Sequence, residues 1–190
     1  MLERRPALTR GTAAPAAFEG VRLSERPHTG KVNLRGDPSD RAFRAAIGRA
    51  LDLVLPTDPN AATTSGGVTA IWLGPDEWLL TCQPGSERKL MARLREALQG
   101  VHAAVTDVTD ARTILRIEGA GARDVLAKGC PLDLHPRALP PGAVAQSRLA
   151  KADVLLHRVD SGDDGAPAFD LHVGRSFAGY LWAWLEEASR

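Results

Sequence analysis

The chain has 190 residues, of which 44% are hydrophobic, so it is long enough to bury one substantial core or two smaller lobes. Its 24 Lys and Arg residues against 23 Asp and Glu residues leave a net charge of +1, which excludes the strongly basic surface that gathers nucleic acid or an anionic membrane. No segment approaches the roughly 18 apolar residues of a membrane-spanning helix, and no apolar stretch of about 7 to 15 residues follows the basic start. We therefore expect a cytoplasmic protein with neither a nucleic acid nor a membrane as its partner.

The N-terminal part of the sequence predicts a tail, two strands and a helix. Residues 1–16 are rich in Ala, Pro, Thr and Arg without periodicity, which is typical of a flexible tail. We expect residues 17–190 to form one bilobed domain, which begins with the short strands "VRLSER" and "KVNLRG". The segment "DPSDRAFRAAIGRALDLVLP" predicts a helix, because Asp37 can cap it and apolar residues recur every three or four positions until Pro56.

A tryptophan-rich hairpin and a second helix follow. Two apolar runs in "VTAIWLGPDEWLLTCQ" flank the turn sequence "GPD", which predicts a hairpin with Trp72 before the turn and Trp78 after it. The segment "SERKLMARLREALQG" predicts a helix that is capped by Ser86 and ends near Gly100.

The second half of the sequence repeats this order of elements. "AAVTDVTD" and "RTILRIEG" predict strands, "AGARDVLAKG" predicts a short helix, and "VAQSRLAK", "DVLLHRV" and "AFDLHVGR" predict three further strands. A last helix is predicted from Ser176, with an apolar stripe made of Phe177, Tyr180, Leu181, Trp184 and Leu185. This order predicts an α+β fold of two ferredoxin-like (split βαβ) halves, with antiparallel sheets and helices packed on one side.

The glycine turn in "GAGARDVLAKG" resembles a nucleotide-binding site only in part. A dinucleotide fingerprint needs glycines at its first, third and sixth places, and here Gly119 and Gly121 fill the first two places while Asp124 fills the last. The Asp124 carboxylate would repel a phosphate, and no GK[ST] of a P-loop follows. We therefore expect Gly119 and Gly121 to serve a tight strand-to-helix turn, and we expect no cofactor-binding residue in this chain.

The histidines and cysteines give one pairing to test. No two of the five histidines form the i, i+4 pair of a helical metal site. If "DVLLHRV" and "AFDLHVG" form a hairpin, His157 comes near Asp170 or His172, and a carboxylate can then orient a general base. The sequence does not fix the register, so the roles of these three residues stay open. Cys82 and Cys130 belong to no CxxC pair, and we expect both to be reduced core residues. We expect no residue of this chain to be catalytic or to bind a metal.

The two tryptophans of the last helix cannot share one helical face, because residues two positions apart are rotated by about 200°. Trp184 lies in the predicted apolar stripe, so we predict that Trp182 points away from the core and marks a partner interface. Trp72, Trp78 and Trp184 are expected to fill the core.

Three separate segments of the sequence carry a resemblance to a known family. They are "WLGPDEWLL", "VTDVTDARTILRIEGAGARDVLAKGCPLDLHPRALPPG" and "FDLHVGRSFAGYLWAWL". Together they resemble the gamma subunits of heterotetrameric sarcosine oxidases, in the right order and over most of the chain after about residue 17. The order of strand, Asp-x-Thr, strand, Gly-x-Gly-Ala and helix is also similar to the aminomethyltransferase, or folate-binding, family, of which this chain is like a truncated copy.

The resemblance implies an oxidoreductase complex of four different chains that demethylates sarcosine to glycine and passes the one-carbon unit to tetrahydrofolate. The alpha, beta and delta subunits would be the partners of this chain. FAD, FMN, NAD and tetrahydrofolate would be bound by those other subunits, and this chain would be an accessory, non-catalytic subunit.

Two alternatives stay open beside this reading: an autonomous folate-binding module for one-carbon transfer, and a stand-alone structural module. A folate site in the wider family relies on a central acidic pair, for which Asp107 and Asp110 are the nearest candidates. Both residues also have structural explanations, because Asp110 can cap a turn and Asp107 lies on a strand face.

Overall fold

A computed structural model describes residues 5–8, 15–159 and 165–190. Parts of the expected N-terminal tail (1–4 and 9–14) and of the connection before the last strand (160–164) lie outside the described residues. The chain divides into two units. The middle unit is Thr29–Asp110, and the split unit combines Met1–His28 with Ala111–Arg190.

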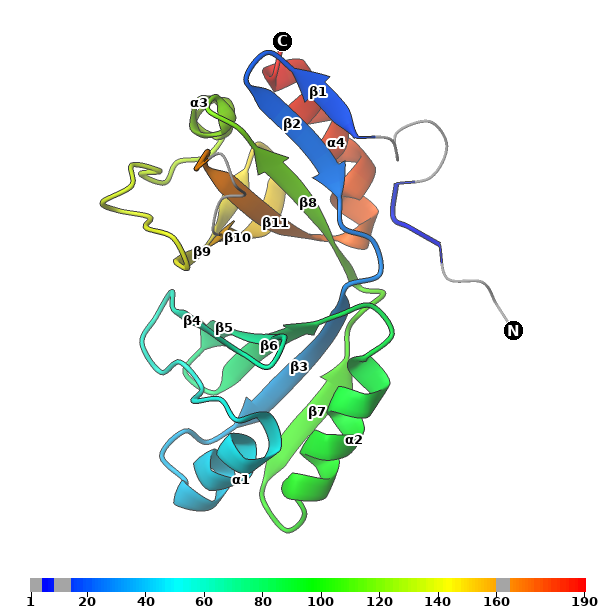
Figure 1. The fold of residues 1–190 in the computed structure, drawn as a ribbon, viewed down its shortest axis with the longest axis vertical. Coiled ribbons are helices and arrows are strands. Elements are labelled where there is room, and N and C mark those ends of the chain that lie inside the picture. Colours follow the sequence, from blue (N-terminus) through cyan, green and yellow to red (C-terminus); the bar gives the residue numbers. More distant parts are fainter. Residues whose placement is uncertain (1–4, 9–14, 160–164) are drawn as a thin grey trace. The chain divides into compact units, whose positions relative to one another are not determined.

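The middle unit is a five-stranded antiparallel sheet with two helices (Figure 1). Its strands pair in the order β4-β5-β6-β3-β7. In chain order the elements are β3 (Gly30–Gly36), α1 (Arg41–Leu51), β4 (Ala62–Ser65), β5 (Val68–Gly74), β6 (Glu77–Cys82), α2 (Glu87–Ala97) and β7 (Ala103–Asp107). The predicted hairpin is confirmed, because Trp72 on β5 pairs with Trp78 on β6.

Helix α1 begins three residues later than its sequence suggests. Its N-cap is Asp40, whose side chain accepts a hydrogen bond from the Ala42 amide at 2.8 Å. Asp37, the predicted cap, instead accepts hydrogen bonds from the hydroxyl and the amide of Ser39. Those bonds favour the carboxylate and lower the pKa of Asp37. The prediction of the Asp37 cap is therefore wrong, because Asp37 closes a local turn that precedes the helix.

Both helices of the middle unit pack on one face of its sheet. Side chains of β3, β5 and β6 form a single buried cluster with Phe43 and Ile47 of α1 and Leu90 and Leu94 of α2. In this cluster the ring centroids of Trp78 and Phe43 are 5.8 Å apart. The indole N–H of Trp78 donates to the Pro56 carbonyl oxygen at 2.7 Å.

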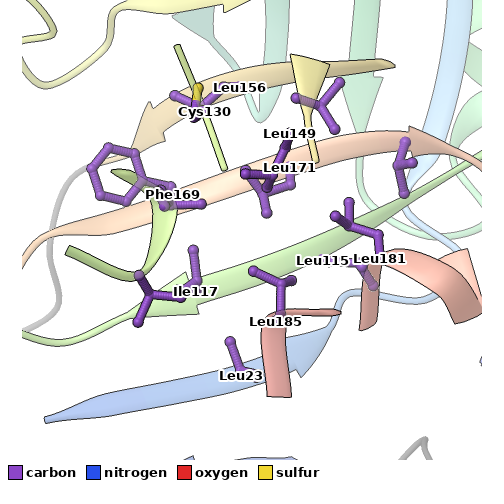
Figure 2. Close-up of a cluster of buried hydrophobic side chains, with 14 of the residues drawn as sticks. Leu23, Leu115, Ile117, Cys130, Leu149, Leu156, Phe169, Leu171, Leu181 and Leu185 are labelled. Carbon is purple, nitrogen blue, oxygen red and sulfur yellow. The ribbon is translucent and has the colours of Figure 1, made fainter. Parts of the chain in front are cut away.

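The split unit is a six-stranded antiparallel sheet with strand order β1-β2-β8-β11-β10-β9. In chain order its elements are β1 (Ala16–Phe18), β2 (Val21–Glu25), β8 (Arg112–Glu118), α3 (Ala122–Ala127), β9 (Val144–Leu149), β10 (Ala152–Val159), β11 (Ala168–Gly174), a 3-10 turn η1 (Arg175–Phe177) and α4 (Ala178–Ala188). Its core joins one face of the sheet to both helices (Figure 2), as Leu23, Leu115 and Leu171 pack with Leu181 and Leu185.

The two units share one strand plan, and the halves of the fold do not follow the halves of the sequence. Four neighbouring strands are ordered β5-β6-β3-β7 in the middle unit and β10-β11-β8-β2 in the split unit, which are two ferredoxin-like arrangements. The predicted α+β fold with antiparallel sheets is confirmed. The sequence did not predict where the units divide: β7 pairs with β3 in the middle unit, and β2 pairs with β8 in the split unit.

Residues 5–8 lie against the split unit, in contrast to the flexible tail that we expected for residues 1–16. Leu8 is 2% exposed and belongs to the core cluster. The amides of Ala7 and Leu8 donate to the Glu25 carboxylate at 3.0 and 3.3 Å. The Arg175 guanidinium donates to the carbonyl oxygens of Arg5 and Pro6. This segment is held because its apolar side chain fills the core and its backbone groups have charged partners.

Candidate functional site

The glycine turn after β8 is filled by the protein's own backbone. Gly119 has φ 118°, and a Cβ atom there would lie 2.2 Å from the carbonyl oxygen of Gly20. The amide of Gly119 donates to the Pro167 carbonyl and that of Gly121 donates to the Gly20 carbonyl, each at 3.0 Å. Both N–H groups that would hold a phosphate are therefore occupied, and both glycines allow a close approach of two backbone segments.

The Asp-x-Thr sequence at the end of β7 makes a structural turn. The Asp107 carboxylate accepts a hydrogen bond from the Thr109 amide at 2.9 Å. The buried Thr109 hydroxyl in turn accepts from the Lys31 amide of β3 at 3.0 Å. Asp107 thus fixes the residue that ties the end of β7 to its neighbouring strand. Asp107 and Asp110 are both exposed, and the carboxylate of Asp107 is engaged in this turn.

A polar row crosses the split unit's sheet on the face opposite its helices, and it contains the candidate residues His157 and Asp170. The predicted hairpin exists, and its register places His157 of β10 opposite Asp170 of β11. On the other side, Asp170 is opposite Arg116 of β8, and Arg116 is opposite Ser24 of β2. His172 lies two residues along β11 on the same face and is 1% exposed.

Asp170 is the centre of an ion-pair network. Its two carboxylate oxygens accept from Arg116 Nε at 2.7 Å and Arg116 Nη2 at 2.9 Å, a bidentate geometry. Arg26 Nη1 lies 3.7 Å from the same carboxylate. Although burial disfavours the charged guanidinium, the hydrogen bond and the charge of Asp170 raise the pKa of Arg116. Asp170 therefore balances two guanidinium groups.

This network joins neighbouring strands of the sheet. Each oxygen of Asp170 accepts a hydrogen bond from Arg116, which ties β11 to β8, and His157 lies opposite Asp170 on β10. The alternation of "RTILRIE", with Arg116 on the polar face of β8, carried the signal for this partner, but sequence reasoning missed it because Arg116 lies far along the chain from Asp170.

Neither the two cysteines nor other side chains of metal-binding types form a metal site in the described part of the chain. Cys82 and Cys130 are free and buried, as the sequence predicts. Burial, together with the nearby charge of Glu87, raises the pKa of the Cys82 thiol. Residues 5–8, 15–159 and 165–190 contain no group of three His, Cys, Asp or Glu side chains that could hold a metal ion. Among these residues no helix has the length and apolarity required to span a bilayer.

The prediction of an exposed Trp182 is wrong. Trp182 is 1% exposed and belongs to the core cluster of the split unit. The buried face of α4 consists of Ala178, Leu181, Trp182 and Leu185. Trp184 lies at the margin of that core and covers Gly129, where a Cβ atom would come within 2.5 Å of its ring. The buried stripe is therefore rotated by one residue from the predicted one.

Comparison with known proteins identifies the family. The family model described as "Sarcosine oxidase, gamma subunit family" matches residues 35–190. The chain belongs to this family. A sarcosine oxidase subunit gamma of Corynebacterium sp. (strain P-1) is 33% identical over 190 residues, which cover 98% of this chain and 90% of the relative. The predicted resemblance to sarcosine oxidase gamma subunits is therefore confirmed.

Two solved structures share the fold of this gamma subunit. A chain of the heterotetrameric sarcosine oxidase from Corynebacterium sp. U-96 superposes with a TM-score of 0.81 at 31% identity, over 93% of this chain and 87% of that chain. Aminomethyltransferase T from Bartonella henselae superposes with a TM-score of 0.65 at 17% identity, over 86% of this chain and 44% of that chain. The second likeness shows the fold alone, and it confirms that this gamma subunit resembles a truncated aminomethyltransferase domain.

Proposed function

We propose that this chain is the accessory gamma subunit of a heterotetrameric sarcosine oxidase, an oxidoreductase that demethylates sarcosine to glycine. The family match over residues 35–190 carries this proposal. The likeness to a chain of the Corynebacterium complex supports it, because nearly the whole of both chains superposes. The partners of this chain are then the alpha, beta and delta subunits of the same complex.

We further propose that the chain contributes structure and no catalytic residue. Asp170 is engaged by Arg116, the amides of the Gly119–Gly121 turn donate to backbone carbonyls, and the pKa of the Cys82 thiol is raised. FAD, FMN, NAD and tetrahydrofolate then belong to the other subunits, and the one-carbon unit passes to tetrahydrofolate there. The alternative of an autonomous folate-binding module is supported by the fold alone, and Asp107 serves a turn.

The two free, buried cysteines are compatible with a reducing compartment, which supports a proposed cytoplasmic location. Secretion to an oxidising compartment would more commonly accompany a disulfide framework.

Co-expression with the other three subunits tests the proposed function. We expect an affinity-tagged chain to retain all three through gel filtration. The chain expressed alone should show no visible flavin band and should release no heat when it is titrated with tetrahydrofolate. Failure to retain the other subunits would overturn the assembly role, and a flavin band or saturable folate binding by the isolated chain would overturn the non-catalytic role.

A further inference from the structure

A hollow of about 720 Å³ opens in the split unit where the β9–β10 turn faces η1. Residues of β8, β9, β10 and η1 meet around it. We name it the basic hollow, and the lining residues used below are Arg112, Arg148, Lys151, Asp153, Ser176 and Phe177. None of these residues belongs to the polar row around Asp170.

The charge of the hollow differs from that of the chain as a whole. Its lining has three cationic side chains, Arg112, Arg148 and Lys151, and one carboxylate, Asp153. The net charge of the entire chain is only +1, so positive charge is concentrated here. Arg148 Nε and Asp153 Oδ1 are 3.9 Å apart and highly exposed, so water screens their attraction. The hollow therefore attracts an anionic group.

Exposed aromatic side chains lie beside this positive charge. Among the described residues the large exposed hydrophobic side chains are Val54, Phe177 and Tyr180. Phe177 lines the hollow, and the Tyr180 hydroxyl accepts a hydrogen bond from the amide of the lining residue Lys151. Phe177 is 48% exposed, and Tyr180 follows three positions later at 41%. Aromatic side chains next to arginines are the composition of anchoring regions in protein–protein interfaces.

The rim that presents Lys151 is held in a defined conformation. Ala150 has φ 53°, a left-handed conformation that is uncommon for alanine. The Ala150 amide donates to the Gly129 carbonyl at 2.9 Å, and the Lys151 amide donates to the Tyr180 hydroxyl at 3.3 Å. A fixed rim loses less conformational entropy when a partner binds. The strand that precedes this turn, β9, is also the edge strand of its sheet, where a further chain segment has access.

We propose that the basic hollow is a docking site for a segment of another subunit, with an acidic side chain in the hollow and an apolar side chain against Phe177 and Tyr180. This inference rests on the proposed role in a heterotetramer. A free carboxylate ion would satisfy the positive charge and leave both aromatic rings in water, whereas a peptide segment covers both. The observed combination of charge and exposed rings therefore favours a protein partner.

Matched variants in the co-expressed complex test this docking site. The charge variant is Arg148→Glu with Lys151→Glu, and its control is Arg41→Glu with Arg88→Glu, two exposed arginines of the middle unit. The apolar variant is Phe177→Ser, and its control is Val54→Ser, because Val54 is 82% exposed. The amount of each partner subunit recovered per tagged chain is measured, together with the melting temperature of each free full-length variant.

We expect the charge variant to lower recovery by about tenfold or more and Phe177→Ser to lower it several-fold, with unchanged melting temperatures. The two controls should match the wild-type chain. Recovery of the wild-type complex should also fall as salt is added. Wild-type recovery from both hollow variants would overturn the docking site and leave the proposed function standing, whereas no recovery by the wild-type chain would overturn both.

Addition of sodium acetate distinguishes between a protein segment and a small anion as the occupant of the basic hollow. A rise in melting temperature of the free chain with acetate, lost in the Arg148→Glu/Lys151→Glu variant and accompanied by normal recovery, would assign the hollow to a free carboxylate. That result would contradict the docking proposal. We expect acetate to leave the melting temperature of the chain unchanged.

Discussion

The middle unit and the split unit reach the same strand order by different routes along the chain. In the middle unit β7 follows α2 directly and completes the sheet beside β3. In the split unit the corresponding strand, β2, comes from the N-terminal part of the chain and pairs with β8. The comparison shows that a repeated fold does not require a repeated sequence division, because a strand can be supplied from either direction. It also makes the split unit dependent on the N-terminal residues.

The two units also bury their central tryptophans differently. Trp78 in the middle unit has an acceptor for its indole N–H in the Pro56 carbonyl. Trp182 in the split unit is equally buried, and the described residues offer no hydrogen-bond acceptor to its Nε1 atom. The first core therefore gains a polar contact as well as packing, whereas the second relies on packing.

Removal of residues 1–28 should have the largest effect and should separate the two units. It deletes β1 and β2 and exposes the apolar side chains of β8 that pack with Val21 and Leu23. We expect the split unit to lose its slowly exchanging amides while α1 and α2 keep theirs, as measured by hydrogen exchange with mass spectrometry. Equal loss of protection in both units would show that they fold as one cooperative structure.

Replacement of Trp182 by alanine should destabilise the free subunit by about 3 to 5 kcal/mol, because a large side chain leaves a filled core. Trp184→Ala is the matched control and should cost less, since Trp184 lies at the margin of that core. Urea melts of the two variants provide the comparison. A greater loss from Trp184→Ala would contradict the observed orientation of α4.

Substitution of Asp170 by asparagine should cost about 2 to 4 kcal/mol, because it leaves Arg116 partly buried without its carboxylate partner. The magnitude stays below that of a fully buried pair because the Arg116 side chain is 22% exposed. Glu187→Gln, which removes an exposed pair with Arg190, should change stability by less than about 0.5 kcal/mol. Equal effects in the two denaturant melts would show that the Asp170 network adds nothing to the split unit.

Phenylalanine at the two central tryptophan positions should give the smallest difference. Trp78→Phe removes a buried hydrogen bond and leaves the Pro56 carbonyl without its donor, whereas Trp182→Phe removes none that the described residues make. We expect Trp78→Phe to cost about 1 to 2 kcal/mol more than Trp182→Phe in thermal melts. A larger cost for Trp182→Phe would indicate that its indole N–H has a partner.

The sequence predicted most elements and missed their division between units. Local patterns predicted the hairpin around Trp72 and Trp78 and the strands that became β8, β10 and β11, because alternation and turn residues act over a few positions. The place of β7 in the middle unit and of β2 in the split unit depends on pairing between distant segments, for which the sequence carries no local signal. The short edge strands β1 and β4 were also missed.

The wrong stripe predicted for α4 and the missed partner of Asp170 also depend on contacts between segments that are distant in sequence. Leu181 and Leu185 fit both possible apolar stripes of α4, and the aromatic side chains favoured the wrong one. In the same way, a hairpin predicted from the sequence placed His157 near Asp170 or His172, but the ion pair of Asp170 is with Arg116 on a strand remote in sequence.

The central claim is that this chain supplies no catalytic residue. The most direct test is to measure the turnover of sarcosine by a complex that carries His157→Gln. His157 is the residue that the sequence placed closest to a catalytic setting, and the variant removes its capacity to act as a base. We predict that kcat per bound flavin stays within about twofold of the unmodified complex, because a general base contributes about 100-fold or more only where it acts. A loss of about 100-fold in a complex that retains all four subunits and its flavin would contradict the claim.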